Sequence, residues 1–320
     1  MIETDFTRLV GCRAPLQVAP MPGLVTVELA AAVSQAGALP LLPTPMSTPE
    51  GMRAQLETLS ASAPGPFGAG FLMPFLDPAV LEIAAERVRV VDFFYGAPDP
   101  ALVRRVHAGG ALAAWQVGSA DEARAAEGAG CDVVVAQGTE AGGHVRGRTS
   151  LLPLLDEVLD AVSVPVVAAG GLATARDLAA VLAAGASGAR MGTRFLAAAE
   201  TATHPRYLEA LLAARAEDTV LTEVFSVMWP DAPHRVLRSA LEAVRDAGEG
   251  ELLGETRDMG QMVPVVARSV IPPNRETTGR IEAMCLYAGE SVGQVTRVQP
   301  AREIVEELVD GAARLLAAGR

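Results

Sequence analysis

One histidine of this chain stands in a segment suited to proton transfer. Residues 137–144 read Gln-Gly-Thr-Glu-Ala-Gly-Gly-His and directly follow an apolar run, 132–136, that predicts a buried strand. Glycine tolerates positive φ and lets a ligand or another backbone approach closely. Because imidazole titrates nearest neutrality among the side chains, His144 is the candidate general base. The alternative is a glycine-rich loop that carries a hydrogen-bonded surface histidine.

Two further strand ends carry glycine turns. Residues 169–171 read Ala-Gly-Gly after the apolar run 165–169, and residues 191–193 read Met-Gly-Thr after the run 187–191. Backbone N–H groups at such turns complement the charge of a phosphate. The pair predicts a site for a phosphorylated cofactor or substrate, and ordinary turns are the alternative.

The elements that must position these residues alternate in type along the chain. Apolar strand-like runs occupy residues 16–19, 38–42, 67–72, 89–93, 111–117, 132–136, 165–169 and 187–191. Helix-like segments follow them, at 25–35, 49–60, from 78, from 100, 120–129, 151–161, 175–184 and 205–214. Eight such units predict an α/β protein closed into a (β/α)8 TIM barrel, and a doubly wound sheet is the alternative. Active sites of such barrels lie at the C-terminal strand ends, where all three glycine signals fall.

The alternation stops in the C-terminal half of the chain. We expect residues 1–216 to form the barrel and residues 217–278 to form a small additional subdomain or lid beside its mouth. Residues 279–320 are expected to supply C-terminal helices that pack back on the barrel. Helices are predicted near 236–245, at 280–286 and at 302–318, the last from its helical period of apolar residues.

Composition and charge restrict the class of partner. The formal net charge of −12 argues against nucleic acid and against anionic membranes, and no apolar stretch reaches membrane-spanning length. Three scattered cysteines and four histidines far apart in the sequence predict neither disulfides nor a metal site. The first residues lack the features of a secretory signal, so a cytoplasmic location is expected. Homo-oligomerisation stays open.

Four segments of the chain resemble the nitronate monooxygenase family, formerly called 2-nitropropane dioxygenases. They are 19–21, 137–144, the pair 169–171 with 191–195, and 284–291. The resemblance implies FMN as cofactor, held at the phosphate by the turns at Gly170, Gly171, Gly192 and Thr193. It also implies flavin contacts from Gln137, Gly142 and Met21, and mainly backbone contacts from Arg190 and Met191.

Three more positions complete the expected flavin site. Gly143 belongs to the glycine segment, and Gln116 ends a predicted strand, where a core hydrogen bond is the alternative to a contact with the flavin pyrimidine. Gly70 stands where the family commonly has asparagine, which leaves one flavin hydrogen bond to be supplied by backbone or water.

The implied reaction is oxidation of small nitronates or nitroalkanes, with O₂ as the final electron acceptor. His144 would remove the α-proton of a neutral nitroalkane, or orient an anionic nitronate. One alternative is an NAD(P)H-dependent enoyl or quinone reductase with the same cofactor. Another is a flavin-free, phosphate-binding barrel.

Overall fold

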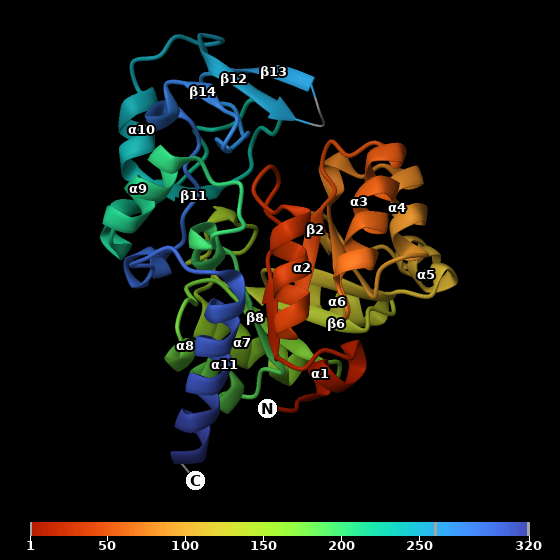
Figure 1. Ribbon diagram of the computed structural model, residues 1–320. Coiled ribbons are helices and arrows are strands. Elements are labelled where there is room, and N and C mark those ends of the chain that lie inside the picture. The colour runs from red at the N-terminus through yellow and green to blue at the C-terminus, as the bar shows by residue number, and fades with distance from the viewer. Residues whose placement is uncertain (1, 259–260, 319–320) are drawn as a thin grey trace.

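The computed structural model describes residues 2–258 and 261–318. Its core is a closed barrel of parallel strands in the order β1-β2-β3-β4-β5-β6-β8-β9 (Figure 1). These strands are β1 (Leu16–Val18), β2 (Leu39–Pro43), β3 (Gly68–Leu72), β4 (Val90–Phe94), β5 (Leu112–Val117), β6 (Val133–Gln137), β8 (Val166–Ala169) and β9 (Gly188–Met191). They are buried almost throughout, which explains why they read as apolar runs. The TIM-barrel prediction is confirmed.

Helices cover the outside of the barrel and begin at residues that cap them. They are α2 (Val27–Ala36), α3 (Pro49–Ser62), α4 (Pro78–Ala85), α5 (Pro100–Gly109), α6 (Ala120–Gly128), α7 (Leu151–Ala161) and α8 (Ala175–Ala183), whereas α1 (Asp5–Val10) packs its Phe6 and Val10 in a cluster with barrel-strand residues. The Thr48 and Asp99 side chains accept hydrogen bonds from first-turn amides, and proline follows each of them. Thr174 forms a reciprocal capping box with Asp177. Local side-chain caps therefore mark the start of these helices except α7, where Ser150 makes no capping hydrogen bond.

The eighth helix of the wall comes from the end of the chain. The segment predicted at 205–214 does form a helix, α9 (Pro205–Ala213), but its buried residues Tyr207 and Leu211 belong to a second hydrophobic core. Instead, α11 (Ala301–Ala318) packs against both α2 and α8 (Figure 1). The division of the chain at residues 216 and 278 stays a prediction.

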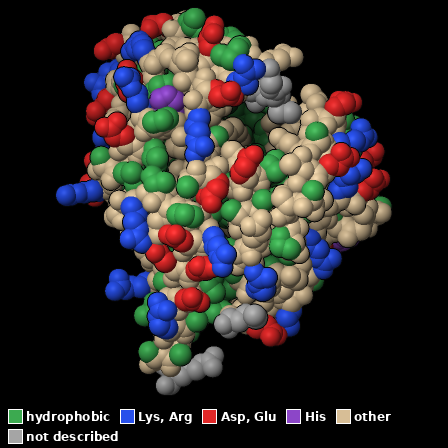
Figure 2. Space-filling model, in the orientation of Figure 1, with side chains coloured by type: hydrophobic (Ala, Val, Ile, Leu, Met, Phe, Trp, Pro, Cys, Tyr) green, Lys and Arg blue, Asp and Glu red, His purple; other side chains and the backbone are tan. Residues whose placement is uncertain are grey.

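Two small antiparallel sheets accompany this second core. One joins β10 (Thr219–Thr222), β11 (His234–Leu237) and the two-residue strand β7 (Gly143–His144) in the order β10-β11-β7. The other joins β13 (Gln261–Val266), β12 (Leu252–Asp258) and β14 (Thr278–Gly279). Figure 2 shows hydrophobic side chains in the hollow between this upper part of the molecule and the barrel helices. Among the residues that the structure describes, no helix is long and apolar enough to cross a membrane.

Two predicted helices of the C-terminal half differ from the structure. The helix expected near 236–245 is α10 (Arg238–Val244), because residues 234–237 pair as a strand. At 280–286 only a short 3₁₀ turn forms, η4 (Ile281–Ala283). Beyond it the backbone is tied to β11, since the Leu237 amide donates to the Leu286 carbonyl at 2.8 Å. Other 3₁₀ turns are η1 (Met73–Phe75), η2 (Thr193–Ala197), η3 (Ala216–Asp218) and η5 (Glu290–Gln294).

The packing of α11 on α8 generates a stability prediction. A Cβ at Gly311 would lie 2.5 Å from the Ala175 Cβ, so this glycine allows the two helices to approach. We expect Gly311→Val to lower the free energy of unfolding by about 1–3 kcal/mol, the usual effect of overpacking. Urea unfolding measures this, with the exposed Ala317→Val in the same helix as control. Equal stability of the two variants would contradict the close helix contact.

Candidate active site

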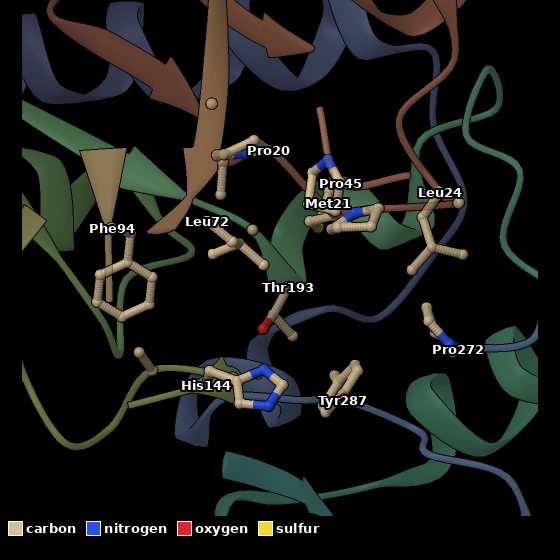
Figure 3. Close-up of a pocket in the computed structure, with 18 of the residues that line it drawn as sticks. Pro20, Met21, Leu24, Pro45, Leu72, Phe94, His144, Thr193, Pro272 and Tyr287 are labelled. Carbon is tan, nitrogen blue, oxygen red and sulfur yellow. The ribbon is translucent and has the colours of Figure 1, made fainter. Parts of the chain in front are cut away.

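A pocket opens at the C-terminal ends of the barrel strands and extends under the second core (Figure 3). Every predicted site residue except Met191 lines it: Met21, Gly70, Gln116, Gln137, Gly142, Gly143, His144, Gly170, Gly171, Arg190, Gly192 and Thr193. The Met191 side chain is buried in the hydrophobic cluster between the strands and the wall helices, and the Met191 carbonyl accepts a hydrogen bond from the Ala19 amide at 3.0 Å. Residues as far apart in sequence as Met21 and Thr193 thus meet in one cavity.

His144 is held at the wall of this pocket by the pairing of β7 with β11, which sets it opposite His234. Its ring stacks on Trp229 with a centroid distance of 3.8 Å and an interplanar angle of 20°. Its Nε2 atom is buried and has no hydrogen-bond partner among the described residues. Figure 3 shows the imidazole beside Tyr287, whose ring centroid is 5.7 Å away.

Burial, and to a smaller extent the nearby His234, lowers the pKa of His144 from its usual value to about 3. The imidazole is therefore neutral at ordinary pH and is available as a proton acceptor. His234 itself is fully buried. One of its ring nitrogens, Nδ1, is 2.8 Å from the Ala232 carbonyl, and the Phe225 amide donates to the other, Nε2, at 3.3 Å. These two bonds fix its tautomer with the proton on Nδ1.

Gln137 ties the histidine strand to the barrel. Its Nε2 donates to the His144 carbonyl at 3.1 Å, while its Oε1 is buried and has no partner among the described residues. An unpaired buried acceptor is unfavourable in a folded protein. The side-chain carbonyl of Gln137 is therefore suited to accept a hydrogen bond from a bound ligand.

The glycines of the site serve two different purposes. Gly143, Gly170 and Gly171 have φ of 73°, 104° and 69°, a region that favours glycine. Gly142 and Gly70 instead allow close packing: a Cβ there would lie 2.5 Å from the Gly289 amide nitrogen and 2.4 Å from the Pro20 Cγ, respectively. Thus Gly70 has a structural explanation besides any flavin contact.

The side chain of Arg190 forms a buried network inside the barrel. It makes a two-pronged ion pair with Asp92, at 2.6 and 3.0 Å, and donates to the Oε1 atoms of Gln116 at 2.6 Å and of Gln17 at 2.9 Å. Burial raises the pKa of the Asp92 carboxyl, and the guanidinium acts in the opposite direction. The expectation of mainly backbone contacts from Arg190 missed this role. Since the Gln116 carbonyl is occupied, its amide NH₂ is the group left for a ligand.

Several lining residues were not among the predicted site residues. Trp229, Ile271 and Tyr287 come from the segment beyond the barrel; no local motif marks the first two, and Tyr287 lies in the family-like segment 284–291 without having been assigned a site role. Glu140, by contrast, is structural, because its carboxylate accepts the Leu151 amide at 3.0 Å where α7 begins. Among the described residues, no group of three or more His, Cys, Asp or Glu is arranged to hold a metal ion.

A closed parallel barrel with a glycine-lined pocket at its strand ends defines an enzyme of the TIM-barrel class. The sequence profile of the family described as "Nitronate monooxygenase" matches residues 76–311. The chain belongs to this family, whose members are flavin-dependent oxidoreductases.

Individual relatives agree with this assignment. A nitronate monooxygenase of Pseudomonas aeruginosa is 34% identical over 269 residues, which cover 69% of this chain and 77% of the relative. A nitroalkane oxidase structure from Streptomyces ansochromogenes has a TM-score of 0.81 and 30% identity, and the match covers 99% of this chain and 100% of that one.

A third relative carries a different activity in its name. A Mycobacterium tuberculosis protein named (3aS,4S,5R,7aS)-5-hydroxy-7a-methyl-1-oxo-octahydro-1H-indene-4-carboxyl-CoA dehydrogenase is 35% identical over 256 residues, covering 77% of this chain and 69% of the relative. Another curated relative is matched over only 61% of its own length. The activity and substrates of the whole protein are therefore matters for proposal.

The low pKa of His144 predicts how stability depends on pH. In the unfolded chain a histidine binds its proton near pH 6.5, whereas in the folded chain His144 binds it only near pH 3. Stability is thus present above pH 6.5 and is lost as pH falls toward 3, since the unfolded state binds more protons. We expect the free energy of unfolding, measured in urea, to fall less between pH 7 and pH 4 in His144→Gln and in His144→Asn than in the wild type. Parallel curves would contradict the buried neutral imidazole.

Proposed function

We propose that this protein is an FMN-dependent enzyme that oxidises alkyl nitronates or nitroalkanes with O₂, with His144 as its catalytic base. The observation that carries the proposal is the position of the His144 imidazole, which lines the barrel-mouth pocket with a buried Nε2 atom that has no partner among the described residues. A neutral imidazole with an unpaired ring nitrogen can accept a proton.

The residues of the pocket fit a flavin mononucleotide. The turns at Gly170, Gly171 and Gly192 would hold its phosphate through backbone N–H groups, after strands β8 and β9 where such barrels bind phosphate. The unpaired Gln137 carbonyl and the Gln116 amide would meet polar atoms of the ring system. A bound flavin would supply the redox chemistry that links oxidation of the substrate to reduction of O₂.

The chain's own residues handle the proton. His144 would take the α-proton of a neutral nitroalkane, which leaves an imidazolium beside the anionic nitronate. Opposite charges attract strongly where water is excluded, so the pocket favours the ion pair once it has formed. Trp229, stacked on the ring at 3.8 Å, adds a cation–π attraction that only the imidazolium feels. A nitronate supplied as the anion would not need this step.

A second candidate is reduction or dehydrogenation of a carbonyl-activated substrate, with NAD(P)H as a partner of the reductase. The 35% identical relative named as a CoA-ester dehydrogenase favours it. Anaerobic mixing of the purified protein with ethylnitronate distinguishes the two, because flavin bands that bleach without NAD(P)H indicate the nitronate reaction. Bleaching by NADH or NADPH alone would favour the reductase.

The base assignment makes a kinetic prediction. We expect His144→Ala to retain flavin and to lose about 10²–10⁴-fold in kcat/KM for nitroethane, the usual contribution of a general base. Its kcat/KM for preformed ethylnitronate should change far less, because no proton is removed. His107→Ala, at an exposed histidine, is the control. Equal losses on both substrates would show that His144 acts in some other way.

The phosphate assignment makes a prediction for Gly192. Its φ of −110° suits any residue, and a Cβ there would meet Ala19 and Met21 only at ordinary contact distances of 3.4 and 3.5 Å. Gly192→Val should therefore fold but project a branched side chain into the phosphate turn. We expect the purified variant to carry little flavin, measured by absorbance after gel filtration.

A matched control for Gly192→Val is Gly128→Val, at an exposed position in α6 with open space around it. This control should retain flavin at the wild-type stoichiometry. Full flavin loading of Gly192→Val would contradict the phosphate site.

A further inference from the structure

Two methionines at the pocket stand where the backbone favours glycine. In the turn Thr44–Ser47, the Ser47 amide donates to the Thr44 carbonyl at 2.9 Å, Pro45 takes the second position, and Met46 takes the third with φ of 65°. This is the pattern of a type II turn, whose third position normally carries glycine.

The second turn, Ser226–Trp229, repeats the arrangement. The Trp229 amide donates to the Ser226 carbonyl at 3.0 Å, and Met228 takes the third position with φ of 77°. A non-glycine residue in this region is strained, and such strain persists where the surroundings or a function require it. The same unusual choice in two separate segments of chain calls for a common explanation.

Packing within the folded chain does not provide that explanation. Met46 is 54% exposed and Met228 is 47% exposed, which is high for a large apolar side chain, and both line the active-site pocket. Methionine is flexible and polarisable, so it adapts to apolar ligands of varied shape. Exposed apolar side chains at the mouth of a pocket mark a surface that a ligand covers.

The remainder of the pocket wall also suits an apolar ligand. Leu24, Pro45, Leu72 and Pro272 face the cavity in Figure 3. Among the described lining residues the only Asp, Glu, Lys or Arg side chains are Asp92 and Arg190, which pair with each other. The described wall thus offers no unpaired charge to an ionic end of a substrate.

We propose that Met46 and Met228, here called the methionine rim, bind the apolar body of the substrate, a hydrocarbon chain or ring system that extends several carbons beyond the reacting group. The inference deepens the proposed function and rests on it only for the identity of the reacting group. It assigns the rim to recognition of a substrate larger than a short nitroalkane.

Binding of unreactive straight-chain alcohols, from 1-propanol to 1-octanol, tests the rim. Isothermal titration calorimetry on the flavin-loaded enzyme gives the Kd of each. We expect the Kd to fall about fourfold for each added methylene, the factor for burying one CH₂. In Met46→Gly and Met228→Gly the Kd of 1-octanol should rise about fivefold or more, while that of 1-propanol stays within about twofold.

Stability supplies an independent readout for the same variants. Glycine relieves the strain at these positions, so both variants should raise the Tm by about 2 °C while they weaken binding. Arg268→Gly is the matched control, because Arg268 has φ of 65° but does not line the pocket. It should raise the Tm without changing any Kd.

Three results would overturn the proposal: a Kd independent of chain length in the wild type, unchanged octanol binding in both glycine variants, or a lower Tm in both. The last would show that the methionines pack in the fold. Turnover of 1-nitropropane and 1-nitrooctane is measured in parallel. If neither is oxidised while the alcohols bind as expected, the proposed nitroalkane reaction fails and the methionine rim stands.

Discussion

The pairing of a two-residue strand with the second core is the constraint on which the site depends. β7 leaves the barrel after β6 and pairs with β11, so the residue that ends it, His144, is placed opposite His234 rather than in solvent. The approach is tight, since Gly142 contacts the backbone at Gly289 and neither position has room for a side chain. The barrel alone would leave this histidine on an open loop. Its burial, its stack on Trp229 and its low pKa all follow from the pairing.

A second constraint lies deeper, where Arg190 and Asp92 are buried together among the barrel strands. A buried ion pair is weak evidence for stability, because removing both ions from water offsets much of their attraction. Its structural effect here is to orient amides: the guanidinium occupies the carbonyls of Gln17 and Gln116. The charges therefore decide which end of Gln116 is presented to the pocket. Specific orientation is the better account of why two ions stand where apolar side chains would fill a barrel.

Sequence reasoning located most of the barrel because its signals are local. Continuous apolar runs, caps such as Thr174 and glycine turns such as Gly170 are read within a few residues. Sequence patterns did not predict the packing of side chains whose contacts come from distant parts of the chain. Residues 205–214 form a helix, but which core takes Tyr207 depends on segments around residue 285. Likewise Trp229 reaches His144 only through the β7–β11 pairing, and Arg190 turns inward because Asp92 lies across the barrel.

The helix α11 that completes the barrel wall has a consequence for the order of synthesis. The last barrel strand to be made, β9, ends at Met191, and about 110 residues follow before α11 begins at Ala301. At translation rates of about 5–20 residues per second, the flanks of α2 and α8 stay uncovered for roughly 5–20 s. During that interval the residues of the second core are being made, so the growing chain exposes the sides of α2 and α8 that α11 later covers. These two helices can therefore make other contacts until α11 has been made.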